Sequence, residues 1–111
     1  MEQRRATKRY RMQLPLQIVQ VGSEKVSRME ETRDVSSGGV SFLSHNGVDV
    51  GGRIEYVDTL SSSNPPVRIR CLGKVLRSQR QGGSDRPFEV AVTMERYQFM
   101  SHQETEALAV A

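Results

Sequence analysis

At 111 residues the chain is long enough for one domain and too short to enclose a second hydrophobic core. Its single cysteine excludes an intrachain disulfide and favours a reducing compartment. The formal net charge is +3, and no apolar run reaches the roughly 18 residues of a membrane-spanning helix. The N-terminus is charged and does not resemble a secretory signal peptide. We therefore expect a soluble, cytoplasmic protein that is not inserted in a membrane.

Residues 1–11 form a basic leader with five cations against one carboxylate, so the rest of the chain is slightly acidic. The cations are Arg4, Arg5, Lys8, Arg9 and Arg11. The leader has no hydrophobic period, and we expect it to be a flexible arm. Cations grouped in one short segment favour a small anionic ligand, because a nucleic-acid-binding protein usually spreads them along a stripe.

Alternating apolar residues after the leader predict six strands. The first runs from Met12 to Ile18, with Pro15 at an edge or bulge because proline cannot donate to a ladder. The others are predicted at residues 26–35, 40–44, 53–57, 67–75 and 88–94, the last two as a hairpin. Six short, regularly spaced strands predict an all-β fold, a six-stranded antiparallel β-barrel over residues 12–97.

The last residues have a helical pattern instead. Ser101-x-x-Glu104 matches a capping box, and residues 104–111 are rich in helix formers. We expect a short C-terminal helix over residues 101–110. Within the barrel, Cys71 alternates with core residues and is expected to be a buried packing thiol.

A tight turn, Asp34-Val35-Ser36-Ser37-Gly38-Gly39, precedes the third predicted strand. Its glycines would permit a positive φ and a close approach of the backbone to a ligand. A carboxylate accepts hydrogen bonds from guanine N1–H and N2–H₂, whereas arginine donates to phosphate and to the O6/N7 edge. If the leader and the turn lie together, they form a pocket for an anionic guanine nucleotide. Taken separately, the leader could be a solvated tail and the turn purely structural.

Arg5-x-x-x-Arg9 followed by Asp34-x-Ser36-x-x-Gly39 resembles the paired signatures of the PilZ domain, the bacterial receptor for cyclic di-GMP. Every motif position is filled, and the resemblance covers most of the chain. It implies a six-stranded barrel with a C-terminal helix, so the periodicity and the resemblance agree.

The resemblance also assigns roles. The two motif arginines would bind phosphate and the O6/N7 edge of guanine, the aspartate and serine would hold a guanine, and the last glycine would allow backbone contact. The expected cyclic di-GMP-binding residues are Arg4, Arg5, Arg9, Asp34, Ser36 and Gly39, with Lys8, Ser37, Gly38 and Arg77 as secondary candidates. In this family a further cation at Arg4 would favour a stacked pair of ligands, so we expect two ligands per chain.

The expected function is that of a bacterial cyclic di-GMP receptor or adaptor. Its arm would fold over the barrel when ligand binds and so signal to a separate partner protein. The sequence leaves open whether the controlled process is motility, biofilm-related adhesion or exopolysaccharide output.

Two alternatives are a PilZ-like interaction adaptor that binds no nucleotide and a single-strand nucleic-acid-binding barrel. The second is poorly supported, because the chain has only six aromatic residues, and they do not cluster on one strand. No catalytic constellation, metal site or cofactor is expected, and His45 and His102 have no third ligand near them in the sequence.

Overall fold

The computed structural model describes residues 8–61, 64–82, 85–101 and 103–104. These residues form eight strands: β1 (Tyr10–Arg11), β2 (Pro15–Val21), β3 (Glu24–Ser36), β4 (Gly39–Ser44), β5 (Arg53–Ser61), β6 (Val67–Arg80), β7 (Phe88–Thr93) and β8 (Arg96–Phe99).

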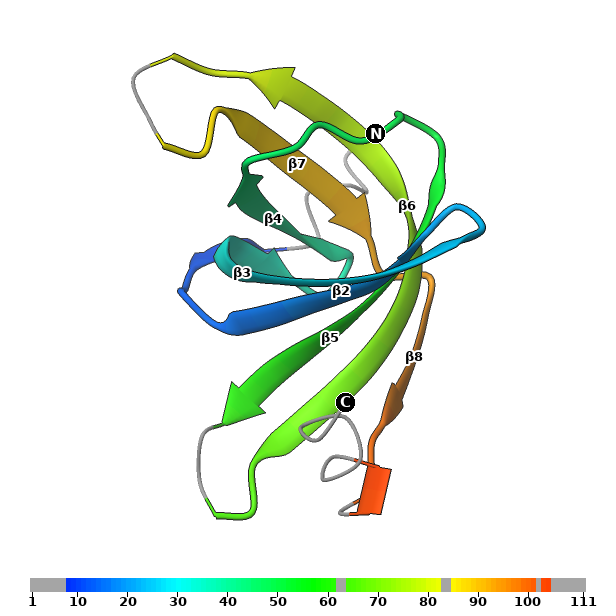
Figure 1. Cartoon of the computed structure of the whole chain (residues 1–111). Helices are drawn as coiled ribbons and strands as arrows, with labels where there is room; N and C mark the ends of the chain where they lie inside the picture. The colour runs from blue at the N-terminus through cyan, green and yellow to red at the C-terminus, as the bar shows by residue number, and fades with distance from the viewer. Residues whose placement is uncertain (1–7, 62–63, 83–84, 102, 105–111) are drawn as a thin grey trace, which may run out of the picture.

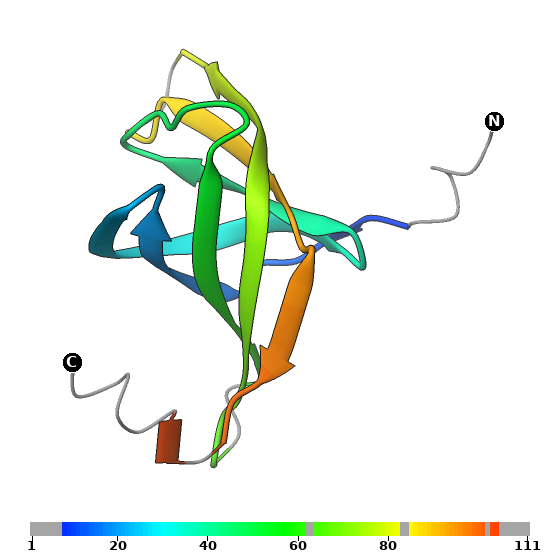
Figure 2. The same cartoon turned by 90° about the vertical axis from the view of Figure 1, so that its right-hand side faces the viewer.

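Six of the strands close a barrel in which every neighbouring pair is antiparallel (Figure 1). The order is β3-β2-β5-β6-β7-β4, and β4 returns to pair with β3. The prediction of a six-stranded antiparallel barrel is confirmed. Two long strands make closure possible, since β6 pairs first with β5 and then with β7, and β3 pairs first with β2 and then with β4 (Figure 2).

Gly73 marks the place where β6 passes from one partner to the other. A Cβ at this position would collide with the carbonyl oxygen of Thr93 at the end of β7, so only glycine allows this approach. The neighbouring Lys74 N–H donates to the Thr93 hydroxyl at 2.8 Å. The close crossing of β6 and β7 therefore depends on the absence of a side chain.

The interior of the barrel is filled by inward-facing side chains of β2, β4, β5, β6 and β7. Val26 and Val35 of β3 are partly buried and pack against this core. Its buried members are Leu16, Ile18, Val40, Phe42, Ile54, Tyr56, Ile69, Cys71, Val75, Val90 and Val92. Cys71 is fully buried, as expected, and burial raises the pKa of its thiol to about 12. The Tyr56 hydroxyl is satisfied by donating to the Thr93 carbonyl at 2.9 Å.

The N-terminal side differs from the sequence prediction in two ways. Tyr10–Arg11, assigned to the flexible arm, pair with β3 as the short strand β1. The strand predicted to begin at Met12 begins at Pro15, as suits a residue that cannot donate to the ladder. Between them, the Thr32 hydroxyl accepts from the Leu14 N–H at 2.9 Å and donates to the Met12 carbonyl at 2.6 Å. The Thr32 side chain thus adds to the backbone hydrogen bonds there, in which the Met12 N–H donates to the Arg33 carbonyl and the Thr32 N–H to the Leu14 carbonyl.

The C-terminal side adds a strand that the sequence analysis did not predict. β8 pairs with the first half of β6, outside the closed barrel. The expected capping box is present: the Glu104 N–H donates to Ser101 Oγ at 3.1 Å, and the Ser101 N–H donates to Glu104 Oε1 at 2.8 Å. Gln103 and Glu104 are helical, and residues 102 and 105–110 of the predicted helix lie outside the described residues.

Candidate ligand-binding site

The β3–β4 hairpin carries the acidic motif. Asp34 lies opposite Ser41, and Ser36 lies opposite Gly39 at the turn. The Ser36 hydroxyl accepts from the Gly38 N–H at 3.2 Å and donates to the Gly39 carbonyl at 3.3 Å. Ser36 is buried, so in this structure its hydroxyl holds the turn closed.

The glycines of this turn have a different role from the one expected. Neither Gly38 nor Gly39 adopts a positive φ, so that part of the prediction was wrong. A Cβ at Gly39 would instead collide with the carbonyl oxygen of Val92 on the neighbouring strand β7. Glycine is required here because β4 and β7 approach one another closely.

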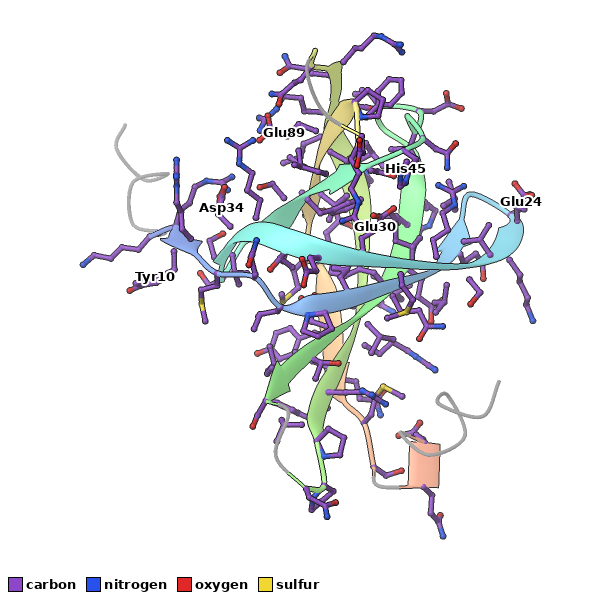
Figure 3. The ribbon with its side chains drawn as sticks, turned by 60° about the vertical axis from the view of Figure 1, so that its left-hand side comes forward. Tyr10, Glu24, Glu30, Asp34, His45 and Glu89 are labelled. Carbon is purple, nitrogen blue, oxygen red and sulfur yellow. The ribbon has the colours of Figure 1, made fainter. Side chains whose placement is uncertain are left out.

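The basic leader meets the acidic motif directly. Arg9 Nη1 lies 2.9 Å from Asp34 Oδ1, and the other carboxylate oxygen accepts from the Ser41 hydroxyl at 3.1 Å. β1 fixes this approach by pairing Tyr10 with Val35 of β3. Figure 3 shows Tyr10 and Asp34 on the same side of the barrel. The arrangement joins the two motif segments and engages both oxygens of the carboxylate.

The remaining predicted leader residues are only partly described. Lys8 is exposed, next to Arg9 in the chain. Arg4 and Arg5 lie outside the described residues, so their placement stays a prediction.

A row of residues crosses four strands on the outer face of the barrel, starting at Asp34. The strand register places Ser41 beside Asp34, Ala91 beside Ser41, and Arg77 beside Ala91. Opposed residues of antiparallel strands share a face, so the secondary candidate Arg77 lies on the same face as the acidic motif. Ser41 and Ala91 are short and form a floor between the two charged ends, and at 1% and 2% exposure this floor is covered by its neighbours.

Sequence reasoning missed two charged residues beside this floor. Arg33 Nη1 lies 3.2 Å from Glu89 Oε2, and Arg77 Nη2 lies 3.9 Å from the same oxygen. Strict alternation would place Arg33 and Asp34 on opposite faces, but β3 has a bulge between Thr32 and Asp34. The Arg–Asp sequence was visible, whereas the bulge that brings both side chains to one face was not.

A hollow of about 740 Å³ adjoins the acidic motif on this side. The leader contributes Arg11, Met12 follows it, β3 contributes Arg33, and the β6–β7 connection contributes Gln81 and Arg86. Arg86 also faces the buried Glu30 carboxylate, with Nη1 3.8 Å from Oε1. The hollow is within the ordinary size of small-molecule sites, about 300–1,000 Å³, and three arginines line it.

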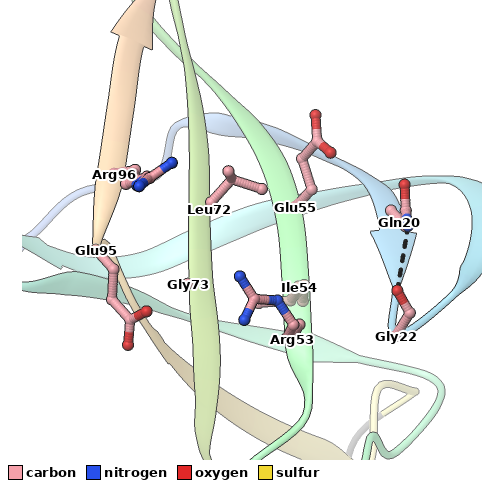
Figure 4. Close-up of a pocket in the computed structure, with 9 residues that line it drawn as sticks. All are labelled: Gln20, Gly22, Arg53, Ile54, Glu55, Leu72, Gly73, Glu95 and Arg96. Carbon is pink, nitrogen blue, oxygen red and sulfur yellow. Dashed lines mark hydrogen bonds between the residues drawn. The ribbon is translucent and has the colours of Figure 1, made fainter.

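A second hollow, of about 320 Å³, lies on the outer face of β2, β5 and β6 (Figure 4). Its charged lining residues are Arg53, Glu55, Glu95 and Arg96. Neither hollow is lined by a predicted site residue. The second hollow has two positive and two negative side chains, whereas the first has Arg11, Arg33 and Arg86 against Glu31 alone. The larger hollow beside Asp34 therefore suits an anionic ligand better.

The described ranges contain no group of three or more His, Cys, Asp or Glu residues placed to hold a metal ion. Within the same ranges, no helix has the length and apolar character needed to cross a bilayer.

The closed barrel and the two joined motifs define a small β-barrel binding domain. The chain belongs to the PilZ domain family, whose family model matches residues 3–108. PilZ domains form a cyclic di-GMP receptor family, and they act by binding rather than by catalysis. The family predicted from the paired motifs is thus confirmed.

Among solved structures, the chain is similar to the Bacillus subtilis inhibitor of motility, MotI/DgrA, with a TM-score of 0.69 and 16% sequence identity. The match covers 97% of this chain and 49% of that one, so this chain spans about half of its length. At this identity the likeness shows the fold alone. No curated protein matches the chain by sequence.

Proposed function

We propose that this protein is a cyclic di-GMP receptor whose basic leader and acidic hairpin form one ligand site. The observation that carries the proposal is the 2.9 Å contact between Arg9 and Asp34, which brings the two family motifs together. A ligand placed there would meet a carboxylate and several guanidinium groups. Each suits a different part of a guanine dinucleotide.

The Asp34 carboxylate fits the donor edge of guanine, because N1–H and N2–H₂ can donate to its two oxygens. In the structure those oxygens are held by Arg9 and Ser41. An incoming guanine would therefore exchange with these partners. The freed Arg9 guanidinium would then turn to O6/N7 or to a phosphate, for which its planar fork is suited.

The phosphates would be bound by the leader. Arg5 completes the basic motif with Arg9, and Lys8 lies between these two residues in the sequence. Arg4 adds a guanidinium that could stack on a second guanine. Arg77 would face the ligand from the far end of the floor. We propose two stacked ligands per chain on this basis.

Signal output follows from the charge of the leader. Without ligand its five cations repel one another, and two phosphates would neutralise part of that charge. The leader would then close over the barrel and change the surface presented to a separate protein in the bacterial cytoplasm. Because Tyr10–Arg11 are already paired with β3, we expect the change upstream of β1.

The test is a calorimetric titration with cyclic di-GMP, repeated with GTP. Arg9→Ala and Asp34→Ala should each weaken binding of cyclic di-GMP by about tenfold or more, since one charge-assisted hydrogen bond contributes about 1.5–3 kcal/mol. Arg53→Ala and Asp49→Ala are matched controls, because both residues are exposed and outside the hollow beside Asp34. Equal losses in the controls, or no binding by the folded native chain, would contradict the proposal.

The rival is an adaptor that keeps the fold without binding nucleotide, as some PilZ proteins do. One observation favours it: Asp34 and Ser36 are already fully engaged by partners within the chain. A folded native chain that produces no heat with cyclic di-GMP would support the adaptor.

A further inference from the structure

β8 is an edge strand that leaves one side of its backbone unpaired. It pairs with β6 alone, and among the described residues no strand lies along its other edge. Figures 1 and 2 agree, since no strand runs beside β8 on the side away from β6. Protein edges of this kind are sites where another chain can add a strand.

The register shows which backbone groups point outward. The Met100 N–H donates to the Arg68 carbonyl at 3.0 Å. Every second residue counted back from Met100, including Gln98, therefore directs its backbone hydrogen bonds toward β6. In an antiparallel ladder the alternate residues point their backbone groups the other way. The N–H and C=O groups of Tyr97 and Phe99 therefore face the free edge.

The same two residues carry exposed aromatic rings. Tyr97 is 61% exposed and Phe99 is 60% exposed. Their partners on β6, Cys71 and Ile69, point into the core, so both rings lie on the core-side face of the sheet. The rings remain exposed because β6 leaves for β7 and the barrel closes without β8.

We propose that the free edge of β8 pairs with the same edge of a second copy of this chain, antiparallel about a two-fold axis through Gln98. In this register Tyr97 lies opposite Phe99 of the second copy, and the reverse holds across the axis. The four outward N–H groups and four outward C=O groups can then form four backbone hydrogen bonds. The aromatic rings form two cross-strand pairs on one face.

The charges along β8 and the length of this strand are compatible with a weak dimer. Arg96 lies opposite Met100 of the second copy, so no like charges are directly opposed. The strand has only four residues, so the interface is below the area of standard stable complexes and the dimer should be weak. In this register the exposed rings of Tyr97 and Phe99 are opposed to the exposed rings of the second copy, which favours a second copy over a peptide without aromatic side chains.

Disulfide trapping tests the register. Gln98 is exposed and lies on the axis, where directly opposed Cα atoms in a non-hydrogen-bonded pair are about 4.5 Å apart, within disulfide range. Gln98→Cys should therefore cross-link two chains under a mild oxidant. Arg96→Cys is the matched control, because its two copies would be four residues out of register, about 13 Å apart. The native Cys71 is fully buried and should not compete.

Preferential cross-linking of Gln98→Cys would support the proposal, whereas equal or absent cross-linking of both variants would overturn it. Sedimentation of the native chain over a concentration series gives a second measurement. Phe99→Lys should raise the dimer dissociation constant by about tenfold or more, because lysines on edges oppose pairing. Met29→Lys, at a 63% exposed position on β3, should leave it unchanged. A native chain that stays monomeric throughout would leave the edge to a different partner and refute the dimer.

Discussion

The Arg9 guanidinium and the Asp34 carboxylate meet at 2.9 Å although the residues are 25 positions apart in the chain. Their side chains are 54% and 21% exposed, so this ion pair stabilises the fold by only about 0–1 kcal/mol. A ligand can therefore replace the contact at little cost. The pair positions the leader beside the hairpin and leaves both charges available for recognition.

The first prediction concerns the shape of the Arg9 side chain. Arg9→Lys should weaken cyclic di-GMP binding about tenfold, because lysine keeps the charge and loses the paired donors. The thermal unfolding midpoint should hardly change, since the ion pair is exposed. Calorimetry and thermal denaturation measure the two effects, with Arg53→Lys as control. An affinity equal to that of the native chain would show that Arg9 acts through charge alone.

The number of ligands bound depends on Arg4 in our proposal. The native chain should bind two cyclic di-GMP molecules, and Arg4→Ala should lower the stoichiometry toward one, because a stacking guanidinium is lost. Calorimetric stoichiometry measures this directly, and Lys25→Ala, near the start of β3, is a control for loss of one cation. A native stoichiometry of one would refute the stacked pair.

Gly39→Ala should destabilise the barrel. The added Cβ would meet the Val92 carbonyl oxygen, and overpacking of this kind typically destabilises by about 1–3 kcal/mol. Chemical denaturation measures the loss. Gly82→Ala is the matched control, because nothing lies within 4 Å of its Cβ position and its φ is not positive. If both variants were equally stable, β4 and β7 would have to separate easily at this point.

Asp58 should make stability depend on pH. Its side chain is 1% exposed, neither carboxylate oxygen has a hydrogen-bond partner within the described ranges, and burial raises its pKa to about 7. The fold thus prefers the protonated carboxyl. The resulting stability is fully present below the unfolded pKa of about 3.9 and is lost as the pH rises through 7.

Asp58→Asn removes this titration. The free energy of unfolding of the variant minus that of the native chain should therefore increase between pH 4 and pH 8, by an amount on the order of 4 kcal/mol. Urea denaturation at several pH values measures the difference, with the exposed Asp49→Asn as control. A difference that does not change with pH would show that the Asp58 carboxyl ionises normally in the barrel.

Much of the fold could be predicted from the sequence because its signals are local. Alternation of apolar residues located the six barrel strands, and the Ser101–Glu104 spacing predicted a cap that the structure contains. The family was predicted from two short motifs, which the family match confirms. β8 was missed because it has only four residues, although Tyr97 and Phe99 alternate with polar residues in the sequence.

Only part of the candidate site could be predicted from the sequence. The residue types at Arg9 and Asp34 predicted that the two segments belong together, because an arginine cluster and a carboxylate are complementary to one guanine nucleotide. Their contact depends on β1 pairing with β3, which two exposed residues do not predict. The proximity of Arg33 and Arg77 to Glu89 required the bulge in β3 and the register across β4 and β7.

The sequence by itself determined the strand pattern, the chemistry of the two motifs and the family, because these are properties of residue types and spacings. Only the tertiary structure decided that Gly39 and Gly73 are needed for close strand contacts, and that β8 has a free edge. The physical reason is that closing a barrel brings distant strands together at distances set by the whole sheet. No segment of the chain encodes those distances alone.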